Sequence, residues 1–404
     1  MVSIVEAGAM NAEIQRVTER RFDLAQSAPV TTSSLRQLVG YCASTQFAKD
    51  LLQGKVPIPP DVDSTTAKLI EEMQRLWTCL NPSHGQVDIT PSIYCYYWGG
   101  TSKATSSALS GIHFGHWKAW RLSAELIRLV CSQLYLITRC GTPPTRWSNG
   151  LQVLLEKVPG VALVDKLRAI LLMEGDFNFY NKWIFGRVAV NKLYDIGYIP
   201  KDQCSKKGCT AEDSKLDNRL TMDLSRQFRQ PLVAVSANAD KCYDRINHII
   251  MSLLLLAIGG DDGSINAMMT PIQQMRFYQR TKRGDSNTFM GRRSGENPLQ
   301  GLCQGNGAAP ACWLMLSSLM MSVYHSGNHV STLVLPITGD VIEFMGEIYV
   351  DDTDLLTILQ DVFDSDEVLQ TAQKNLDKWA ELLIATGGAL NPDKCYWYMV
   401  SYVC

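Results

Sequence analysis

The alternation of apolar and polar positions is sharpest between residues 232 and 264. The run "LVAVSA" (232–237) is short and apolar, which is typical of a buried strand. The apolar positions that follow have the i, i+3, i+4, i+7, i+8 spacing of a core-facing helix: Ile246, Ile249, Ile250, Leu253 and Leu254. The glycines of "IGGDDGS" (258–264) end this helix. The pattern therefore predicts a strand that leads through a polar turn into a buried helix.

A hairpin and a second helix are predicted further along the chain. In "GEIYVDDTDLLTIL" (346–359), two apolar runs meet at an acidic pair, which indicates a hairpin with carboxylates at its tip. An amphipathic stripe follows and is closed by Gly387-Gly388. Its members are Leu369, Ala372, Leu376, Trp379, Ala380 and Leu383. A strand–helix–hairpin–helix order predicts an α+β fold with helices packed on one face of an antiparallel sheet.

The first half of the chain has a weaker pattern. About the first hundred residues are mostly helical in pattern, with a Pro-rich linker at "KVPIPPDVD" (55–63). One long helix is predicted over 110–137. Strands at 151–157 and 166–173, separated by "VPGVAL", predict a second hairpin. The polar stretch "KDQCSKKGCTAEDSK" (201–215) is predicted to be a loop.

Composition places the chain among globular proteins. Of 404 residues, 46% are hydrophobic and 19% are charged, and the formal net charge of −2 carries no overall signature of a polyanion partner. No secretory signal is visible at "MVSIVEAGAM", and the longest apolar runs are too short to span a bilayer. We therefore expect an intracellular protein, nuclear or cytoplasmic, with no membrane partner. Its twelve cysteines are scattered without paired close spacings and are expected to be reduced thiols. Cys204 and Cys209 form a lone C-x4-C with no second pair nearby, which is a weak zinc signal.

The acidic pair Asp351-Asp352 is the clearest candidate for chemistry. Adjacent carboxylates repel each other unless a cation neutralises them, and Mg²⁺ prefers oxygen ligands of this kind. Two such ions can activate an attacking hydroxyl and stabilise a leaving pyrophosphate. Asp is also a common turn residue, so the pair by itself is also explained as the turn of a hairpin.

Four motifs in order change this weighting. "VSANADKCYDRINH" (235–248), "QGLCQGNGAAPACW" (300–313), "GEIYVDDTDLL" (346–356) and "GGALNPDKCYW" (387–397) follow one another at suitable spacings. Over residues 100–404 the series resembles the palm of reverse transcriptases of the non-LTR retroelement type. The segment "LLEKVPG...KLRAILLMEGDFNFYNK" (154–182) is similar to the fingers of the same family.

The resemblance implies a fold and a set of partners. The fold is that of polymerase fingers and palm, an antiparallel palm sheet with helices on one face. It implies a mostly helical N-terminal extension over 1–99, a fingers-like region over 100–230 and a palm over 231–404. The implied function is RNA-directed DNA polymerase, with an RNA template, a DNA primer, deoxynucleoside triphosphates and two Mg²⁺ ions, for which Mn²⁺ can substitute. The chain ends at "YMVSYVC", near the point where the family continues into a thumb, so we expect a fragment or a truncated copy.

Each role is carried over by its place in a motif. Asp351 and Asp352 match the metal-binding aspartates of the YxDD hairpin, and Tyr243 matches the aromatic gate that excludes ribonucleotides. Gln304 and Gly305 match the loop that contacts the incoming nucleotide and the template. Lys157 and Arg168 match the fingers residues that hold the triphosphate. Lys394 matches a lysine that can protonate the departing pyrophosphate. Fixed positive charge suits a triphosphate, although each basic residue is also explained as a solvated surface charge.

Asn238 departs from the family pattern. The motif places the metal-bridging aspartate five residues before Tyr243, at position 238, where this chain has Asn. A carboxamide offers one neutral oxygen, so the loss of charge is expected to weaken metal binding and raise the barrier by about several kcal/mol. Asp240 is the only acidic residue near enough in sequence to compensate, and it lies about 6–7 Å further along a strand.

Two further groups of residues have side chains that are common in binding sites. The segment 275–293 carries six basic residues against one acidic residue and is a candidate track for nucleic acid, or a solvated basic hairpin. Its candidate contacts are Arg280, Lys282, Arg283, Arg292 and Arg293. His113 and His116 are expected to be structural rather than metal ligands, since no further ligand is near in sequence.

Two alternative functions stay open. A catalytically inactive nucleic-acid-binding protein would explain Asn238. An RNA-templated RNA polymerase also uses an Asp-Asp palm, but Tyr243 at the sugar gate favours DNA synthesis, because a ribonucleotide needs room for its 2′-hydroxyl.

Overall fold

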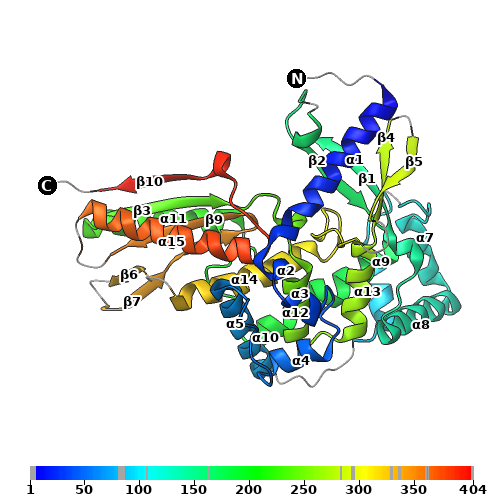
Figure 1. The fold of residues 1–404 in the computed structure, drawn as a ribbon, viewed down its shortest axis with the longest axis horizontal. Coiled ribbons are helices and arrows are strands. Elements are labelled where there is room, and N and C mark those ends of the chain that lie inside the picture. The colour runs from blue at the N-terminus through cyan, green and yellow to red at the C-terminus, as the bar shows by residue number, and fades with distance from the viewer. Residues whose placement is uncertain are drawn as a thin grey trace.

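The structure, a computed structural model, has mixed helices and antiparallel-rich sheets (Figure 1). It describes residues 6–80, 87–105, 108–161, 163–282, 284–292, 296–327, 331–334, 338–359, 362 and 364–401. The α+β class predicted from the pattern is thereby confirmed at this level. None of the helices in these ranges is long and apolar enough to cross a membrane.

The first sheet, here called sheet 1, has the strand order β2-β1-β4-β5. Strands β1 (Asn149–Glu156) and β2 (Leu167–Leu172) are antiparallel, which confirms the predicted hairpin. The basic segment supplies the other half of the sheet, as the antiparallel pair β4 (Arg276–Thr281) and β5 (Gly284–Met290). Strand β4 pairs with β1 in parallel, so two hairpins that are distant in sequence form one sheet.

The second sheet, sheet 2, has the order β10-β3-β9-β8 and is antiparallel throughout. It contains β3 (Leu232–Asn238), β8 (Gly346–Tyr349), β9 (Asp352–Ile358) and β10 (Tyr396–Val400). The predicted strand at 232–237 and the hairpin at 346–359 are both confirmed. A small antiparallel pair, β6 (Ser331–Val334) and β7 (Val341–Phe344), lies beside them.

The main core extends from one face of sheet 2 through the apolar helices to sheet 1. All ten residues of α12 (His248–Ala257) are buried, as expected of a helix that is apolar all round. Helix α15 (Ser365–Ala385) packs on β3 and β9, and it also contacts α14 (Ala309–Gly327) and α5 (Ser64–Leu80). The two helices predicted from 3.6-residue periodicity, α12 and α15, are confirmed.

Helix α11 (Ala211–Phe228) corrects two predictions. The loop predicted over 201–215 ends at Thr210, whose hydroxyl accepts a hydrogen bond from the Asp213 backbone N–H and starts the helix. The prediction of helices on only one face of the sheet is also wrong. Alternate residues of β3 and β9 on the face opposite α15 pack against α11: Leu232, Ala234, Leu356 and Ile358 contact Met222, Leu224 and Phe228.

The single helix predicted over 110–137 is two helices. Helix α7 (Phe114–Ala119) ends in a 3₁₀ turn at Trp120–Leu122, and α8 (Ala124–Cys140) begins after it. The break lies at Ser123, whose Oγ accepts a hydrogen bond from the Leu126 backbone N–H. A serine that caps a new helix competes with continuation of the old one, which explains the error.

The described residues among the first hundred are mostly helical, as predicted, and they pack on the rest of the chain. Helix α1 (Ala7–Asp23) crosses sheet 1 and reaches the centre of the molecule, where the inner end of sheet 2 lies (Figure 1). Short helices follow: α2 (Pro29–Thr32), α3 (Leu35–Val39), α4 (Gln46–Leu52) and α6 (Pro91–Gly100). The remaining helices are α9 (Gly175–Trp183), α10 (Val190–Asp195) and α13 (Asp262–Gln273). Contacts cross both domain boundaries, at 99/100 and 230/231, and these boundaries stay predictions.

Candidate functional site

The acidic hairpin is held in a strained conformation. Val350 has φ of 58°, a region that β-branched residues rarely adopt. Its backbone N–H donates to Ser205 Oγ at 2.7 Å, and its carbonyl accepts a hydrogen bond from Trp313 Nε1. Strain of this kind persists only where the surroundings enforce it, and it is concentrated at functional sites. The two contacts therefore fix the tip that carries Asp351 and Asp352.

Strand pairing brings Asn238 to this tip. Asn238 is the last residue of β3 and lies opposite Asp352 in the register of the sheet. Its Nδ2 donates to Asp352 Oδ1 at 2.6 Å, and the Ala239 N–H donates to the Asp351 carbonyl at 2.8 Å. Asn238 is buried, whereas Asp352 is exposed and Asp351 is half-buried. The three residues assigned to the metal from the motif are thus neighbours.

Their donor set does not fit a pair of divalent cations. Two carboxylates carry two negative charges, against four positive charges on two Mg²⁺ ions, and Asn238 adds none. The Asn238 amide satisfies one Asp352 oxygen without any cation. Over the described residues, no group of three or more His, Cys, Asp or Glu side chains is arranged to hold a metal ion. Two carboxylates with an amide oxygen suit a single hard cation better.

Asp240 does not replace the missing carboxylate in this conformation. Its Oδ2 accepts a hydrogen bond from Arg245 Nη2 at 3.0 Å and lies 3.7 Å from Lys241 Nζ. Its backbone N–H donates to the Ala389 carbonyl. The charge of Asp240 is therefore compensated by two neighbouring cations, and it lies outside strand β3, which ends at Asn238.

Tyr243 lies beside the hairpin in a cavity of about 560 Å³. Val350 and Trp313 also line this cavity, so the aromatic ring and the acidic tip share one surface. Burial raises the pKa of Tyr243 to about 12, and the hydroxyl stays protonated at neutral pH. The Leu302 N–H donates to the Tyr243 carbonyl at 2.8 Å, which ties this turn to the loop that leads into Gln304.

The Gln304-Gly305 loop lies against strand β2 of sheet 1. The Gln304 carbonyl accepts a hydrogen bond from the Leu171 N–H of β2 at 2.7 Å. Gly305 has φ of +121°, and a Cβ added there would lie 2.1 Å from the Leu171 carbonyl oxygen. Only glycine allows this approach of the loop to the strand.

The predicted triphosphate cations converge from three segments. Lys157 follows β1, Arg168 lies on β2 opposite Leu155, and Lys394 lies in the turn before β10. The pKa of Lys157 is lowered, first by burial and then by the positive charges of Arg21, Lys394, Arg168 and Lys241. The Lys394 turn is also tied to the acidic tip, since the Asn391 N–H donates to the Asn238 carbonyl at 2.8 Å.

Two cations of this group were not predicted. Lys241 lies in the motif "VSANADKCYDRINH" (235–248), so its position in the sequence could have indicated that it lies near the site. Arg21 comes from α1, and no pattern in the sequence connects it with residues more than a hundred positions away. The charges of both cations act on Asp244, which is buried, and burial raises the pKa of the Asp244 carboxyl to about 6.

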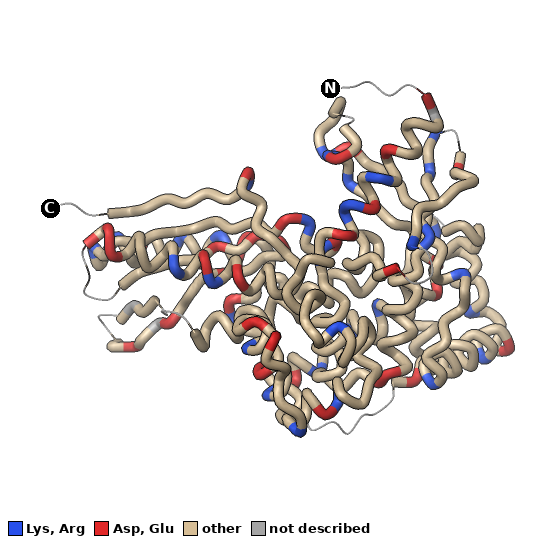
Figure 2. Tube along the Cα trace, in the orientation of Figure 1, with Lys and Arg blue, Asp and Glu red and all other residues tan. Residues whose placement is uncertain are grey.

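The basic segment is less basic in the structure than in the sequence. Arg280 forms an ion pair with Asp285 across the hairpin turn at 2.7 Å. Arg292 forms ion pairs with Glu19, at 2.9 Å, and with Asp23, both on α1. Lys282 is exposed, and Arg283 and Arg293 lie outside the described residues. Figure 2 shows acidic and basic positions interspersed along α1 and around sheet 1.

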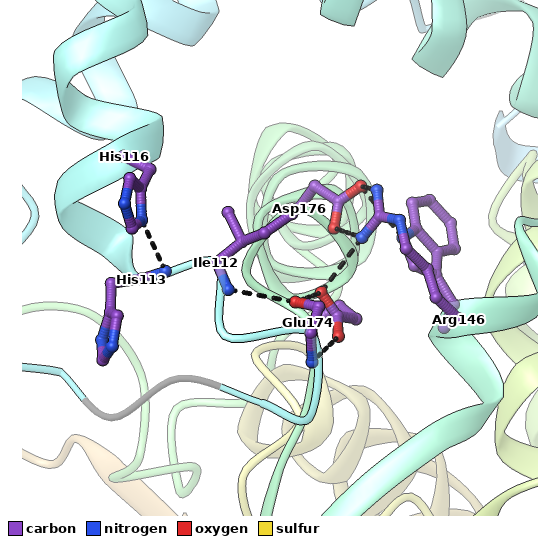
Figure 3. Close-up of polar contacts among 8 residues, drawn as sticks. Ile112, His113, His116, Arg146, Glu174 and Asp176 are labelled. Atoms are coloured by element: carbon purple, nitrogen blue, oxygen red, sulfur yellow. Dashed lines mark hydrogen bonds and ion pairs between the residues drawn. The ribbon is translucent and has the colours of Figure 1, made fainter.

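A buried charge cluster that the motifs did not indicate lies between α9 and the 3₁₀ turn at Thr145–Ser148 (Figure 3). The Arg146 guanidinium binds both Asp176 oxygens and lies 3.1 Å from Glu174 Oε2. The Glu174 and Asp176 side chains are 1% and 2% exposed. Trp147 Nε1 donates to Asp176, and Ser110 Oγ donates to Glu174. The cluster fixes the start of α9.

Arg146→Ala is expected to destabilise the protein strongly. It leaves two buried carboxylates unpaired, which costs about 3–5 kcal/mol of unfolding free energy. Burial already raises the pKa of Glu174, so the loss should shrink as falling pH protonates this carboxyl. Urea denaturation at several pH values measures both effects. Arg128→Ala is the control, because Arg128 forms an exposed pair with Glu125 worth below about 1 kcal/mol. Equal losses in the two variants would contradict the assignment.

The two histidines near this cluster have a local role. His116 Nδ1 accepts a hydrogen bond from the His113 backbone N–H at 3.0 Å, which caps the start of α7 (Figure 3). This contact accounts for His116 as a structural residue.

A scan against models of protein families finds no match, and a search of curated protein sequences also finds none.

Proposed function

We propose that this chain is a reverse-transcriptase-like module of the RNA-directed DNA polymerase class. Sheet 1 serves as the fingers and sheet 2 as the palm. In this proposal the sites for triphosphate and sugar are assembled, but the metal pair lacks one carboxylate. The observation that supports the proposal is the acidic tip, where strand pairing sets Asn238 beside Asp352 and the turn that carries Lys394 is hydrogen-bonded to the Asn238 carbonyl through Asn391.

The chemistry of the class divides among these groups. Asp351 and Asp352 are the residues that would hold a divalent cation, which would supply neutralisation of the charge on a departing pyrophosphate. The residues of this chain bind and orient the nucleotide. Lys157 and Arg168 neutralise the triphosphate, which fixed cations bind by charge-assisted hydrogen bonds. Tyr243 closes the sugar side and excludes a 2′-hydroxyl, which favours deoxynucleotides over ribonucleotides. Gln304 and Gly305 form the loop that contacts the nucleotide, and this loop is held against β2 at Leu171.

Asn238 sets the expected activity of this copy. With two carboxylates at the tip, binding of two cations is weak and nucleotidyl transfer is slow. The alternative is a catalytically inactive protein that binds RNA template and DNA primer, and the Asn238–Asp352 hydrogen bond is the observation that favours it. Both functions predict nucleic-acid binding that weakens with salt.

Nucleotide binding tests the proposal without requiring turnover. Arg168→Ala is expected to weaken binding of deoxythymidine triphosphate with Mg²⁺ by about ten- to a hundredfold, since a hydrogen bond to a charged group is worth roughly 1.5–3 kcal/mol. The matched control is Arg226→Ala on α11, where Arg226 is exposed and pairs with Asp223. Isothermal titration of the unaltered chain and both variants measures the effect. Equal affinity in all three proteins would rule out this nucleotide site.

A further inference from the structure

Arg21 joins the two halves of the candidate nucleotide site. Its Nη2 donates to the Leu167 carbonyl at 3.1 Å, and its Nε lies 4.0 Å from Asp244 Oδ2. The Arg21 side chain is 7% exposed. Arg21 therefore does not reach solvent as a surface cation, and it acts on the site through its two neighbours.

Leu167 and Asp244 are each adjacent in sequence to a residue of the proposed nucleotide site. Leu167 precedes Arg168, the predicted triphosphate residue of β2, and Asp244 follows Tyr243, the predicted sugar gate. One guanidinium thus connects the strand that carries the triphosphate cation with the turn that carries the gate. The distance between Arg168 and Tyr243 is therefore expected to depend on the contacts of Arg21 with Leu167 and Asp244.

Asp244 gives the link a second consequence. It is completely buried, and Arg21 is the strongest of the cations that oppose its raised pKa, followed by Lys241 and Lys157. Without Arg21, the Asp244 carboxylate would rely on these two lysines. Lys241 and Lys157 would then be drawn toward Asp244 and away from an incoming phosphate.

Other contacts hold α1 in place independently of Arg21. Thr18 Oγ1 and the Gln152 side chain of β1 form a buried hydrogen bond at 3.2 Å. The Phe22 ring stacks on Phe277 of β4 at 5.1 Å, and Arg292 pairs with two α1 carboxylates. Loss of the Arg21 side chain is therefore expected to leave the helix docked while releasing its two partners.

We propose that Arg21 is a positioning residue of the nucleotide site, and that α1 holds the triphosphate cations at a set distance from Tyr243. This inference rests on the proposed function of the site. It assigns α1 a part in nucleotide recognition and makes the N-terminal helix necessary for discrimination between deoxyribose and ribose.

The test compares Arg21→Ala with Arg20→Ala. Arg20 is adjacent on α1 and exposed, so it controls for charge and helix propensity. Titration with deoxyuridine triphosphate and with uridine triphosphate, which differ only at the 2′ position, gives the two affinities and their ratio in the presence of Mg²⁺. Arg21→Ala is expected to weaken deoxynucleotide binding about tenfold, the effect of one charged hydrogen bond, and to reduce the preference for deoxyribose. Arg20→Ala should change neither.

A double variant keeps the test decisive if Arg21→Ala unfolds. Arg21→Ala/Asp244→Asn removes the buried carboxylate together with its partner, a replacement that is often tolerated. Affinity should return to within about threefold of the unaltered chain, because no buried carboxylate is left to draw Lys157 away from phosphate. The deoxyribose preference should stay reduced, since the link to Leu167 is still lost.

The outcomes separate the inference from the proposed function. If Arg168→Ala weakens binding while Arg21→Ala, or the double variant, keeps both the affinity and the deoxyribose preference, Arg21 has no positioning role and the inference is overturned. If Arg168→Ala also has no effect, the nucleotide site itself is wrong.

Discussion

Asn238→Asp is expected to raise primer extension on an RNA template, with Mg²⁺, by at least about a hundredfold. Restoring a metal-bridging carboxylate supplies several kcal/mol of transition-state stabilisation, and about 1.4 kcal/mol corresponds to tenfold in rate. The structure places position 238 opposite Asp352, with the side chains 2.6 Å apart, so a carboxylate there reaches the same point. Extension of a labelled primer by the two proteins measures the effect.

The same substitution should make stability depend on the cation. In the unaltered chain the Asn238 amide donates to Asp352, whereas an aspartate would bring a third negative charge against the pair. Asn238→Asp is therefore expected to unfold at a lower temperature than the unaltered chain without divalent cations. Added Mg²⁺ or Mn²⁺ should restore its Tm, because a ligand that binds only the folded state stabilises it.

Two controls make the result specific. Asp351→Asn in the Asn238→Asp background should abolish the gain by removing another carboxylate from the tip. Asp240→Asn should leave extension unchanged, because Asp240 is paired with Arg245. If the unaltered chain extends primers as well as Asn238→Asp does, the role assigned to position 238 is wrong and Asp240 becomes the residue to test.

Gly305→Ala is the second large effect that we expect. The added Cβ would lie 2.1 Å from the Leu171 carbonyl oxygen, at a φ of +121° that L-residues rarely adopt. Overpacking and the backbone penalty together cost about 3 kcal/mol of unfolding free energy. Because the Gln304 carbonyl accepts from the Leu171 N–H, the loop should also separate from β2 and reduce nucleotide affinity. Urea denaturation and nucleotide titration measure the two losses.

Gly115→Ala is the matched control for this substitution. Gly115 lies in α7, and a Cβ added there meets nothing within 4 Å. The change should be neutral or stabilise the protein by up to about 1 kcal/mol, because alanine has the higher helix propensity. A Gly305→Ala protein as stable as Gly115→Ala would show that the loop relaxes away from β2 at little cost.

Local pattern determined much of the candidate site. Alternation of apolar residues placed β3 and the β8–β9 hairpin, and 3.6-residue periodicity placed α12 and α15, because strand and helix faces repeat over a few residues. The order of the motifs put Asn238 and Asp352 on strands of one predicted palm. These features depend on neighbours in sequence, so the sequence alone predicts them.

Tertiary structure alone decided the rest. The parallel pairing of β1 with β4 joins Asn149 to Arg276, and α11 covers the second face of sheet 2. Arg21 reaches Leu167 and Asp244 only because α1 crosses the junction between the sheets. Pairings over such separations are selected by burial of whole surfaces and by compensation of buried charge. No local periodicity records them, and the residues that join the two halves of the site were therefore invisible in the sequence.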